Sequence, residues 1–163
     1  LAVAIFCTCL VSQMPGGRSA ELGMAVVLEG RYRVVDGDTI SLAGLRIRLH
    51  AIDAPELRQS CGGSQGEPTP CGMQAAAALA GFIEPGPIMC QPRTRDRYGR
   101  IVAICYAGAV DVGRKMVRMG WARAYAAFDR RYVVEETEAR AARRGLWRGP
   151  WDSPADWRRT RRR

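Results

Sequence analysis

The apolar residues of the chain fall into short runs typical of β-strands and longer runs in which they recur at helical spacing. The strand-like runs cover residues 40–42, 45–52, 88–94 and 101–106. The helical runs cover the alanine-rich residues 73–83, residues 111–119 and residues 132–144. Strands followed by a helix, further strands and two more helices predict an α+β fold. We expect a five-stranded β-barrel of the OB type with three helices packed around it.

Glycine and proline residues mark where the predicted helices end. The sequence PGP at 85–87 ends the first helix, because proline cannot continue a helix. Gly120 ends the second helix, and Gly145 lies in a C′-like position after the third. Leu146 and Trp147 follow directly, and we expect both to fold back onto the core.

One acidic turn precedes and another follows a predicted hairpin along the chain, in the stretch VVDGDTISLAGLRIRLHAIDAPE at 34–56. The first turn, DGDT, begins at Asp36, and the second, DAPE, begins at Asp53. If the two runs between them pair through the turn at residues 43–44, both acidic turns lie at the same end of the hairpin. Up to four carboxylates then converge beside Arg48, which lies on the strand leading into that point.

This arrangement suits the cleavage of phosphodiesters. Carboxylate oxygens are ligands of hard cations, and a guanidinium matches two phosphate oxygens. Each acidic turn alone is also typical of a structural role, since Asp-Gly is a common hairpin turn and DAPE can cap the next element. The two turns together, with an arginine between them, favour a functional site.

Composition supports a polyanionic partner without deciding the function. The 163 residues include 25 Lys+Arg against 16 Asp+Glu, a formal net charge of +9, and Lys115 is the only lysine. Arginine favours phosphate, and a basic surface attracts polyanions. A positive surface that only aids solubility is the alternative.

The ends of the chain divide it into three parts: residues 1–23, 24–148 and 149–163. Residues 1–11 are apolar and too short to cross a bilayer comfortably, and they resemble the apolar part of a secretory signal peptide. We therefore expect a secreted or periplasmic protein. The alternative is anchorage to the membrane through an uncleaved N-terminal segment. The Trp- and Arg-rich tail is expected to be disordered, and either to contact nucleic acid nonspecifically or to be only solvated.

Two of the six cysteines lie in the apolar N-terminal run, and the remaining four allow three disulfide pairings. Cys61 and Cys71 flank the loop GGSQGEPTP, which a disulfide would close. We therefore predict a Cys61–Cys71 disulfide, which supports export.

The second predicted disulfide joins the two strand-like runs on either side of the turn at residues 96–99. If Arg95 pairs with Arg100, Cys90 lies opposite Cys105 on one face of the hairpin, so we predict a Cys90–Cys105 disulfide. A zinc site is disfavoured, because there is no Cys-x-x-Cys pair and His50 is the only histidine.

Four motifs of the chain, VVDGDT, IRLHAIDAPE, DRYGR and the late GLW, resemble those of the thermonuclease family, also called staphylococcal nuclease-like. The resemblance covers residues 25–147, with the motifs in the family's order and spacing. It implies an OB-type fold and a calcium-dependent nuclease that cuts DNA and RNA with little sequence preference, leaving 3′-phosphates. We expect a monomer with no obligate protein partner.

The resemblance also implies a calcium (Ca²⁺) site. Asp38 and Asp53 match the metal carboxylates of the family, and Asp36 lies just behind them. The residue after Asp53 gives the metal its backbone carbonyl. It is often threonine in the family and is Ala54 here, which keeps the carbonyl.

Three further residues match the catalytic positions of the family: Arg48, Glu56 and Arg100. In this interpretation Glu56 orients or activates the attacking water, and the two arginines stabilise charge on the phosphoryl group. Arg97 and Tyr98 match contacts to a terminal phosphate, with arginine where lysine is more typical.

Two other classes of function stay open from the sequence. One is a noncatalytic nucleic-acid-binding OB module, and the other is a membrane-anchored envelope protein with a basic surface. His50 is predicted to be a packing residue, because family members commonly carry an apolar residue there and the sequence suggests no partner for it.

Overall fold

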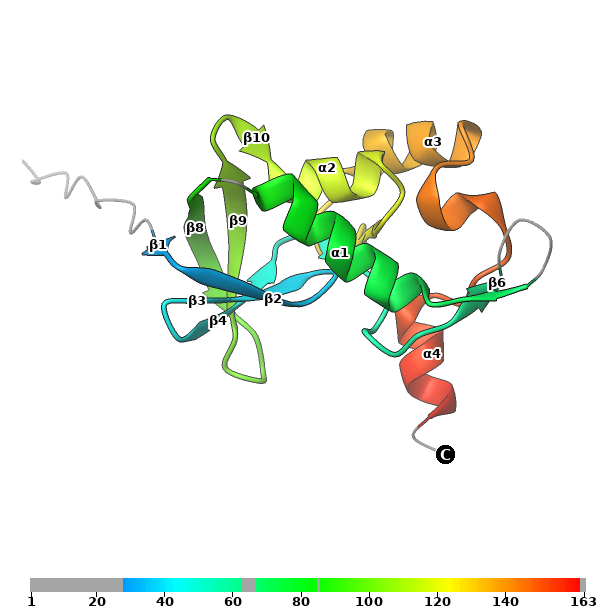
Figure 1. The fold of residues 1–163 in the computed structure, drawn as a ribbon, viewed down its shortest axis with the longest axis horizontal. Coiled ribbons are helices and arrows are strands. Elements are labelled where there is room, and N and C mark those ends of the chain that lie inside the picture. Colours follow the sequence, from blue (N-terminus) through cyan, green and yellow to red (C-terminus); the bar gives the residue numbers. More distant parts are fainter. Residues whose placement is uncertain (1–27, 63–66, 85, 162–163) are drawn as a thin grey trace, which may run out of the picture.

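The computed structural model describes residues 28–62, 67–84 and 86–161 and shows an α+β fold (Figure 1). The predicted signal-like segment lies outside the described residues. The main sheet has the strand order β1-β8-β9-β4-β3-β2, with β10 paired to β9. All neighbours in this sheet are antiparallel except β4 and β9. Its strands are β1 (Leu28–Gly30), β2 (Tyr32–Asp36), β3 (Thr39–Leu42), β4 (Leu45–Leu49), β8 (Ile88–Arg95), β9 (Ile101–Ala107) and β10 (Val110–Asp111).

Two small sheets and the helices complete the fold. The strands β5 (Ile52–Asp53) and β11 (Arg123–Ala124) form one pair, and β6 (Cys61–Gly62) and β7 (Pro68–Thr69) form the other. The helices are α1 (Cys71–Ile83), α2 (Val112–Arg118), α3 (Val133–Ala141) and α4 (Pro154–Thr160), with a 3₁₀ helix at Gly145–Arg148. Among the described residues, no helix has the length and apolar character needed to cross a membrane.

The arrangement is consistent with the predicted OB-type fold but differs in detail. The main sheet has seven strands rather than five, and the pairings among the described residues leave β1 and β2 at its two ends, so no closed barrel forms. In Figure 1, β8 and β9 run across the direction of β2, β3 and β4, as expected for a sharply bent sheet. The structure also has a fourth helix, α4, where a disordered tail was predicted.

The predicted hairpin at the centre of the chain is confirmed. Strands β3 and β4 pair from Thr39 opposite Arg48 to Leu42 opposite Leu45. The turn between them, Ala43-Gly44, has φ values of 49° and 82°, as a two-residue hairpin turn of type I′ requires. Both acidic turns therefore lie at the same end of the hairpin.

The second hairpin, β8–β9, brings Cys90 opposite Cys105 as predicted, but its register differs nearer the turn. A bulge between Pro92 and Thr94 shifts the pairing by one residue, so Arg95 faces Ile101 rather than Arg100. Proline has no backbone N–H for the ladder, which explains an irregularity at this point. The predicted pairing of Arg95 with Arg100 was therefore wrong.

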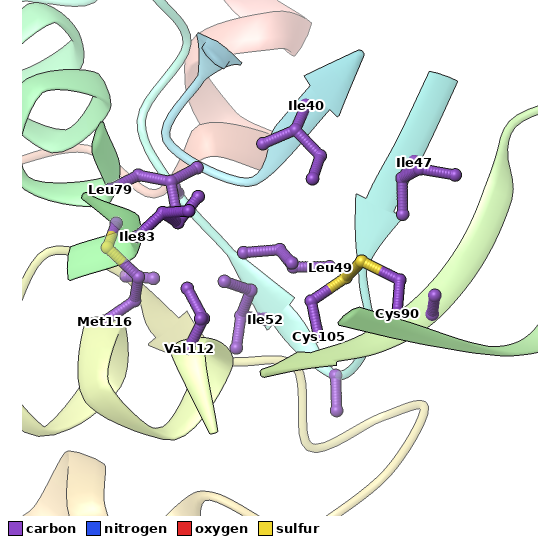
Figure 2. Close-up of a cluster of buried hydrophobic side chains, with 14 of the residues drawn as sticks. Ile40, Ile47, Leu49, Ile52, Leu79, Ile83, Cys90, Cys105, Val112 and Met116 are labelled. Carbon is purple, nitrogen blue, oxygen red and sulfur yellow. A yellow bond between two sulfur atoms is a disulfide. The ribbon is translucent and has the colours of Figure 1, made fainter. Parts of the chain in front are cut away.

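The core lies between the sheet, α1 and α2, which contribute apolar side chains to one continuous cluster (Figure 2). Ile40 and Leu49 from the first hairpin pack there with Leu79 of α1 and Met116 of α2. The Cys90–Cys105 disulfide borders the same cluster. The packing fixes the hairpin that carries both acidic turns.

Both predicted disulfides are present. Cys61 and Cys71 are bonded with a Cα–Cα distance of 5.7 Å, and Cys90 and Cys105 with one of 4.1 Å. Leu146 is buried against Cys61 and Cys71, as expected for a residue that folds back onto the protein.

The third predicted helix ends earlier than expected, at Ala141. Arg143 has a φ of 49°, which is not helical, and Gly145 has a φ of 51°. The backbone of this turn packs against Gly120, where the Leu146 N–H donates to the Gly120 carbonyl at 2.9 Å. A Cβ added to Gly145 would lie 2.5 Å from that carbonyl oxygen, so the close contact requires glycine.

Candidate active site

The two acidic turns and several arginines face a single open cavity of about 710 Å³. The carboxylates that line it are Asp36, Asp38, Asp53, Glu56 and Asp96, and the cations are Arg46, Arg48, Arg97, Arg100 and Arg158. Tyr98, Tyr125 and Phe128 add aromatic surface. All the side chains that the sequence predicts for metal binding, catalysis and phosphate contact therefore share one cavity.

Arg48 joins the two acidic turns directly. Because Arg48 lies opposite Thr39 in the β3–β4 register, its side chain reaches the DGDT turn. Its Nη1 donates to Asp38 Oδ1 at 2.7 Å, and its Nη2 donates to Asp53 Oδ1 at 3.1 Å. The two aspartates, separated along the chain by the hairpin, thus share one guanidinium.

Backbone and hydroxyl groups fix the Asp38 carboxylate. Its Oδ1 accepts from the Thr39 hydroxyl at 2.9 Å, and its Oδ2 accepts from the Ala54 N–H at 3.1 Å. The Asp38 N–H in turn donates to Asp36 Oδ1 at 3.0 Å. Asp38 and Asp53 are each only 4% exposed, so both carboxylates are largely removed from water.

Burial and neighbouring negative charge raise the pKa values of two carboxylates in this cluster. Burial, followed by the charge of Asp38, raises the pKa of Asp36 to about 6. Burial also raises the pKa of Asp53, and the cations Arg158 and Arg48 only partly offset it. Burial therefore disfavours the ionised form of Asp36 and Asp53 more strongly than the neighbouring groups favour it.

These residues fit a hard cation by chemistry. Buried carboxylates with raised pKa values gain most from a neighbouring positive charge, and the donors are all oxygen, as calcium prefers. Asp38, Asp53 and the carbonyl of Ala54 are the groups that would hold it. Within the described ranges, no three acidic, histidine or cysteine side chains form a group that could hold a metal ion. Arg48 pairs with Asp38, and Arg158 pairs with Asp53.

Arg100 enters the cavity from the start of β9, held by the preceding turn. Its Nε donates to Asp96 Oδ2 at 2.7 Å, and Asp96 Oδ1 accepts from the N–H groups of Tyr98 and Arg100. Although burial opposes it, these hydrogen bonds lower the pKa of Asp96. A carboxylate that stays ionised keeps the position of the Arg100 side chain fixed.

Arg97 and Tyr98 lie at the exposed mouth of the cavity. Arg97 Nη2 donates to the Tyr98 hydroxyl at 2.8 Å, and its guanidinium lies 4.9 Å from the centre of the Tyr98 ring. Tyr98 is 61% exposed. The pair is therefore accessible to a ligand from solvent.

Glu56 has a partner that sequence reasoning missed. Arg158 of α4 donates from Nη1 to Glu56 Oε1 at 2.6 Å and approaches both carboxylate oxygens of Asp53 at 3.4 to 3.5 Å. In the sequence, Arg158 belongs to a run of arginines next to the C-terminus, which is equally typical of a solvated tail. Nothing in that run distinguishes this arginine from its neighbours.

His50 packs in the fold as predicted, but it has a partner that the sequence did not reveal. Its Nε2 lies 2.9 Å from Asp129 Oδ2, and its ring makes an edge contact with Phe128. Although it lies on the chain beside Leu49, it does not line the cavity. These contacts hold the 125–129 loop against the sheet.

The fold and the site define a small α+β protein in which an acidic cluster and several arginines face one open cavity. A sequence model described as "Staphylococcal nuclease homologue" matches residues 46–149, which is more than half of the chain. The chain therefore belongs to the staphylococcal nuclease family.

Relatives of the chain carry names of different kinds. It is similar to the succinoglycan biosynthesis protein ExoI of Rhizobium meliloti (strain 1021), with 36% identity over 78% of this chain and 69% of ExoI. It is also similar to the probable staphylococcal-like nuclease CAN2 of Oryza sativa subsp. japonica, with 31% identity over 89% of this chain and 38% of CAN2. The probable endonuclease lcl3 of Botryotinia fuckeliana (strain B05.10) is 30% identical over 88% of this chain and 57% of its own length. The chain thus spans less than two thirds of the last two relatives.

Proposed function

We propose that this protein is a calcium-dependent nuclease that hydrolyses phosphodiester bonds of DNA and RNA with little sequence preference. The observation that carries the proposal is the convergence of Asp38, Asp53, Arg48, Glu56 and Arg100 on one cavity. Membership of the staphylococcal nuclease family supports nuclease activity in general, as do the two relatives named as nucleases.

In this proposal the chain's own residues bind, orient and stabilise the reacting groups. Calcium, when bound by Asp38, Asp53 and the Ala54 carbonyl, supplies positive charge for a phosphate oxygen. Arg48 and Arg100 stabilise the negative charge that builds on the phosphoryl oxygens during attack. Arg48 donates to the buried Asp38 and Arg100 donates to the partly exposed Asp96, and these hydrogen bonds hold both guanidinium groups at the cavity.

Glu56 orients the attacking water and accepts its proton, which is the ordinary role of a carboxylate beside a phosphoryl group. Arg97 and Tyr98, at the mouth of the cavity, contact a terminal phosphate of the substrate. Cleavage leaves a 3′-phosphate, as the resemblance to thermonucleases implies.

The test is an incubation of the purified protein with plasmid DNA, single-stranded DNA and RNA, first in calcium and then in chelator. We expect cleavage that requires calcium and leaves 3′-phosphate ends. Calcium should also raise the unfolding temperature, since it binds the folded acidic cluster and not the unfolded chain. Binding without cleavage would instead indicate a noncatalytic nucleic-acid-binding OB module.

Two variants test the catalytic roles. Glu56→Gln and Arg100→Ala should keep the fold and still bind DNA, with rates lower by on the order of a hundredfold or more. Arg118→Ala is the matched control, because Arg118 pairs with Glu138 on the helices outside the cavity. Wild-type turnover in both site variants would exclude this mechanism.

We also propose that the protein acts in an oxidising environment, either secreted or periplasmic. The two disulfides support this, because disulfides persist in such compartments and are rare where glutathione keeps thiols reduced. Mass spectrometry of native material should find all four of these cysteines bonded. Four free thiols would contradict export.

A further inference from the structure

Arg158 comes from the far C-terminus, yet its guanidinium lies between two carboxylates of the proposed site. Nη1 lies 2.6 Å from Glu56 Oε1, and the two terminal nitrogens lie 3.4 to 3.5 Å from the carboxylate of Asp53. Among the described residues, Arg158 is the only recorded hydrogen-bond partner of the Glu56 carboxylate. The Glu56 side chain is 39% exposed, so without Arg158 it would be free to turn into solvent.

The segment that carries Arg158 is fastened to the loop that carries Glu56. Gln59, which is only 1% exposed, accepts from the Glu56 N–H through Oε1 at 3.2 Å and donates from Nε2 to the Asp152 carbonyl at 2.8 Å. Three residues further on, the Gly62 N–H donates to the Pro150 carbonyl at 2.9 Å. A buried polar side chain with both ends satisfied is costly to rearrange, so Glu56 and the C-terminal segment (residues 149–161) keep a fixed relation.

Helix α4 begins at a defined point beyond this attachment. The Ser153 hydroxyl accepts from the Asp156 N–H at 3.2 Å as the N-cap, and Pro154 occupies the first turn. Figure 1 shows α4 beside the start of α1, at the end of the molecule where the β6–β7 pair lies. The helix therefore presents Arg158 to the cavity from outside the part of the chain that the family model matches, residues 46–149.

We propose that Arg158 is a positioning residue of the active site, which holds the Glu56 carboxylate towards the cavity, and that the C-terminal segment is an integral part of that site. The inference rests on the proposed nuclease function. An arginine fork suits this role because it can hold two carboxylates in one geometry. Arg158 acts through Glu56, and the reacting phosphate is stabilised by Arg48 and Arg100.

The experiment is a double-mutant cycle on the full chain, measuring kcat and KM for single-stranded DNA in calcium. The variants are Arg158→Ala, Arg158→Lys, Glu56→Gln and the combination of Arg158→Ala with Glu56→Gln. Arg159→Ala is the matched control: Arg159 neighbours Arg158 on α4, but it pairs with Asp156 and does not line the cavity. Thermal unfolding of each variant reports whether the fold is kept.

Arg158→Ala should lower kcat by about tenfold to a hundredfold, the range seen when an outer partner of a site residue is lost, with KM changed less than threefold. Arg158→Lys should restore part of kcat, because lysine keeps the charge without the fork. In the Glu56→Gln background, Arg158→Ala should have little further effect, since the group it positions is already gone. Arg159→Ala should match wild type.

Each contrary result is decisive. Additive losses in the cycle would mean that Arg158 acts independently of Glu56, through Asp53 or on the substrate. A higher kcat in Arg158→Ala would mean that Arg158 blocks the site, and either result overturns the positioning role. A loss fully explained by unfolding, and shared by Arg158→Lys, would also overturn it. If wild type and Arg159→Ala cleave no nucleic acid, the proposed function fails and this inference fails with it. Cleavage by wild type with additive losses defeats the inference alone.

Discussion

Asp36 and Asp38 lie two residues apart and line the same cavity, where their negative charges repel each other. Asp38 is held by the Thr39 hydroxyl, the Ala54 N–H and Arg48. Asp36 accepts from the Asp38 N–H at 3.0 Å, but no arginine of the described residues forms an ion pair with it. Burial and the charge of Asp38 therefore raise the pKa of Asp36 to about 6. Above that pH the charge of Asp36 destabilises the folded protein.

Asp36→Asn should therefore stabilise the protein in chelator at pH 7.5. Because the folded pKa of about 6 lies above the ordinary value of 3.8, the wild-type carboxyl favours folding at low pH and loses that contribution as pH rises through 6. Asparagine keeps an acceptor for the Asp38 N–H without the charge. We expect a gain of about 1 kcal/mol, or a few degrees in the unfolding temperature.

The control for Asp36→Asn is pH itself. At pH 5 the wild-type carboxyl is already largely protonated, so the gain should shrink. Thermal unfolding at both pH values measures the change in stability caused by Asp36→Asn. A change of the same size at pH 5 and pH 7.5 would contradict the charge argument.

At the scale of elements, the loop between β5 and α1 determines where Glu56 lies. Gln59 binds the Glu56 N–H, the Cys61–Cys71 disulfide closes the loop, and Gly72 at the start of α1 packs against the Glu56 carbonyl. A Cβ added to Gly72 would lie 1.8 Å from the carbonyl oxygen of Glu56. The site thus depends on a close contact between backbones as well as on its charged side chains.

Gly72→Ala should displace this loop or unfold the protein. The clash is with backbone atoms, which cannot turn aside, so we expect a loss of about 1–3 kcal/mol or more together with loss of cleavage. Gly81→Ala, on the same helix, is the matched control, because nothing lies within 4 Å of its added Cβ. Alanine should stabilise the helix there by roughly 0.5–1 kcal/mol. Thermal unfolding and the nuclease assay measure both, and a Gly72→Ala protein as active and stable as wild type would show that the loop yields easily.

The two disulfides should separate stability from activity. Replacing Cys90 and Cys105 together by serine removes a link between strands of the core, so we expect about 2–4 kcal/mol lower stability but near-normal turnover at low temperature. Replacing Cys61 and Cys71 together should lower kcat as well, because that disulfide links the segment that follows Glu56 to the start of α1, where Gly72 packs against the Glu56 carbonyl. Denaturant unfolding and kcat at 10 °C measure the two effects. Equal effects of both pairs on kcat would argue against a special role for the loop.

At the scale of the whole molecule, local features were predictable and long-range ones were not. The β3–β4 hairpin follows from the strand pattern and its two-residue turn, so the meeting of Asp38, Arg48 and Asp53 could be predicted. The contact of Arg158 with Glu56 spans 102 residues and depends on the buried Gln59, whose role no periodicity indicates.

The other differences have the same physical origin. The third helix ends at Ala141 because the turn at Gly145 packs against Gly120, a contact between separate elements. The bulge in β8 shifts the pairing of Arg95 because a proline interrupts the hydrogen-bond ladder. The position of the bulge in the register depends on the partner strand. Tertiary contacts of this kind override local preference.

The charge distribution of the molecule predicts how substrate binding responds to salt. The net charge is +9, yet Arg48 and Arg158 in the cavity already pair with carboxylates, whereas Arg97 at its mouth contacts only Tyr98 in the recorded hydrogen bonds of the described chain. Nucleic acid releases counterions for each phosphate that a cation neutralises. On single strands, the plot of log affinity against log salt concentration therefore has a slope of about −0.7 per contact. Arg97 should therefore contribute one phosphate contact to this slope. Arg48 and Arg158, which already pair with carboxylates, should each contribute less than one.

Arg97→Ala should make the plot of log affinity against log salt shallower by about 0.7. The measurement is fluorescence anisotropy of a labelled single-stranded oligonucleotide in calcium. Every protein also carries Glu56→Gln, so that the ligand is bound while cleavage is slow. Arg118→Ala in the same background is the control, because Arg118 lies on α2 outside the cavity and should leave the slope unchanged. If Arg97→Ala keeps the full slope while Arg118→Ala reduces it, nucleic acid tracks the helical face, and the cavity mouth is not where the strand enters.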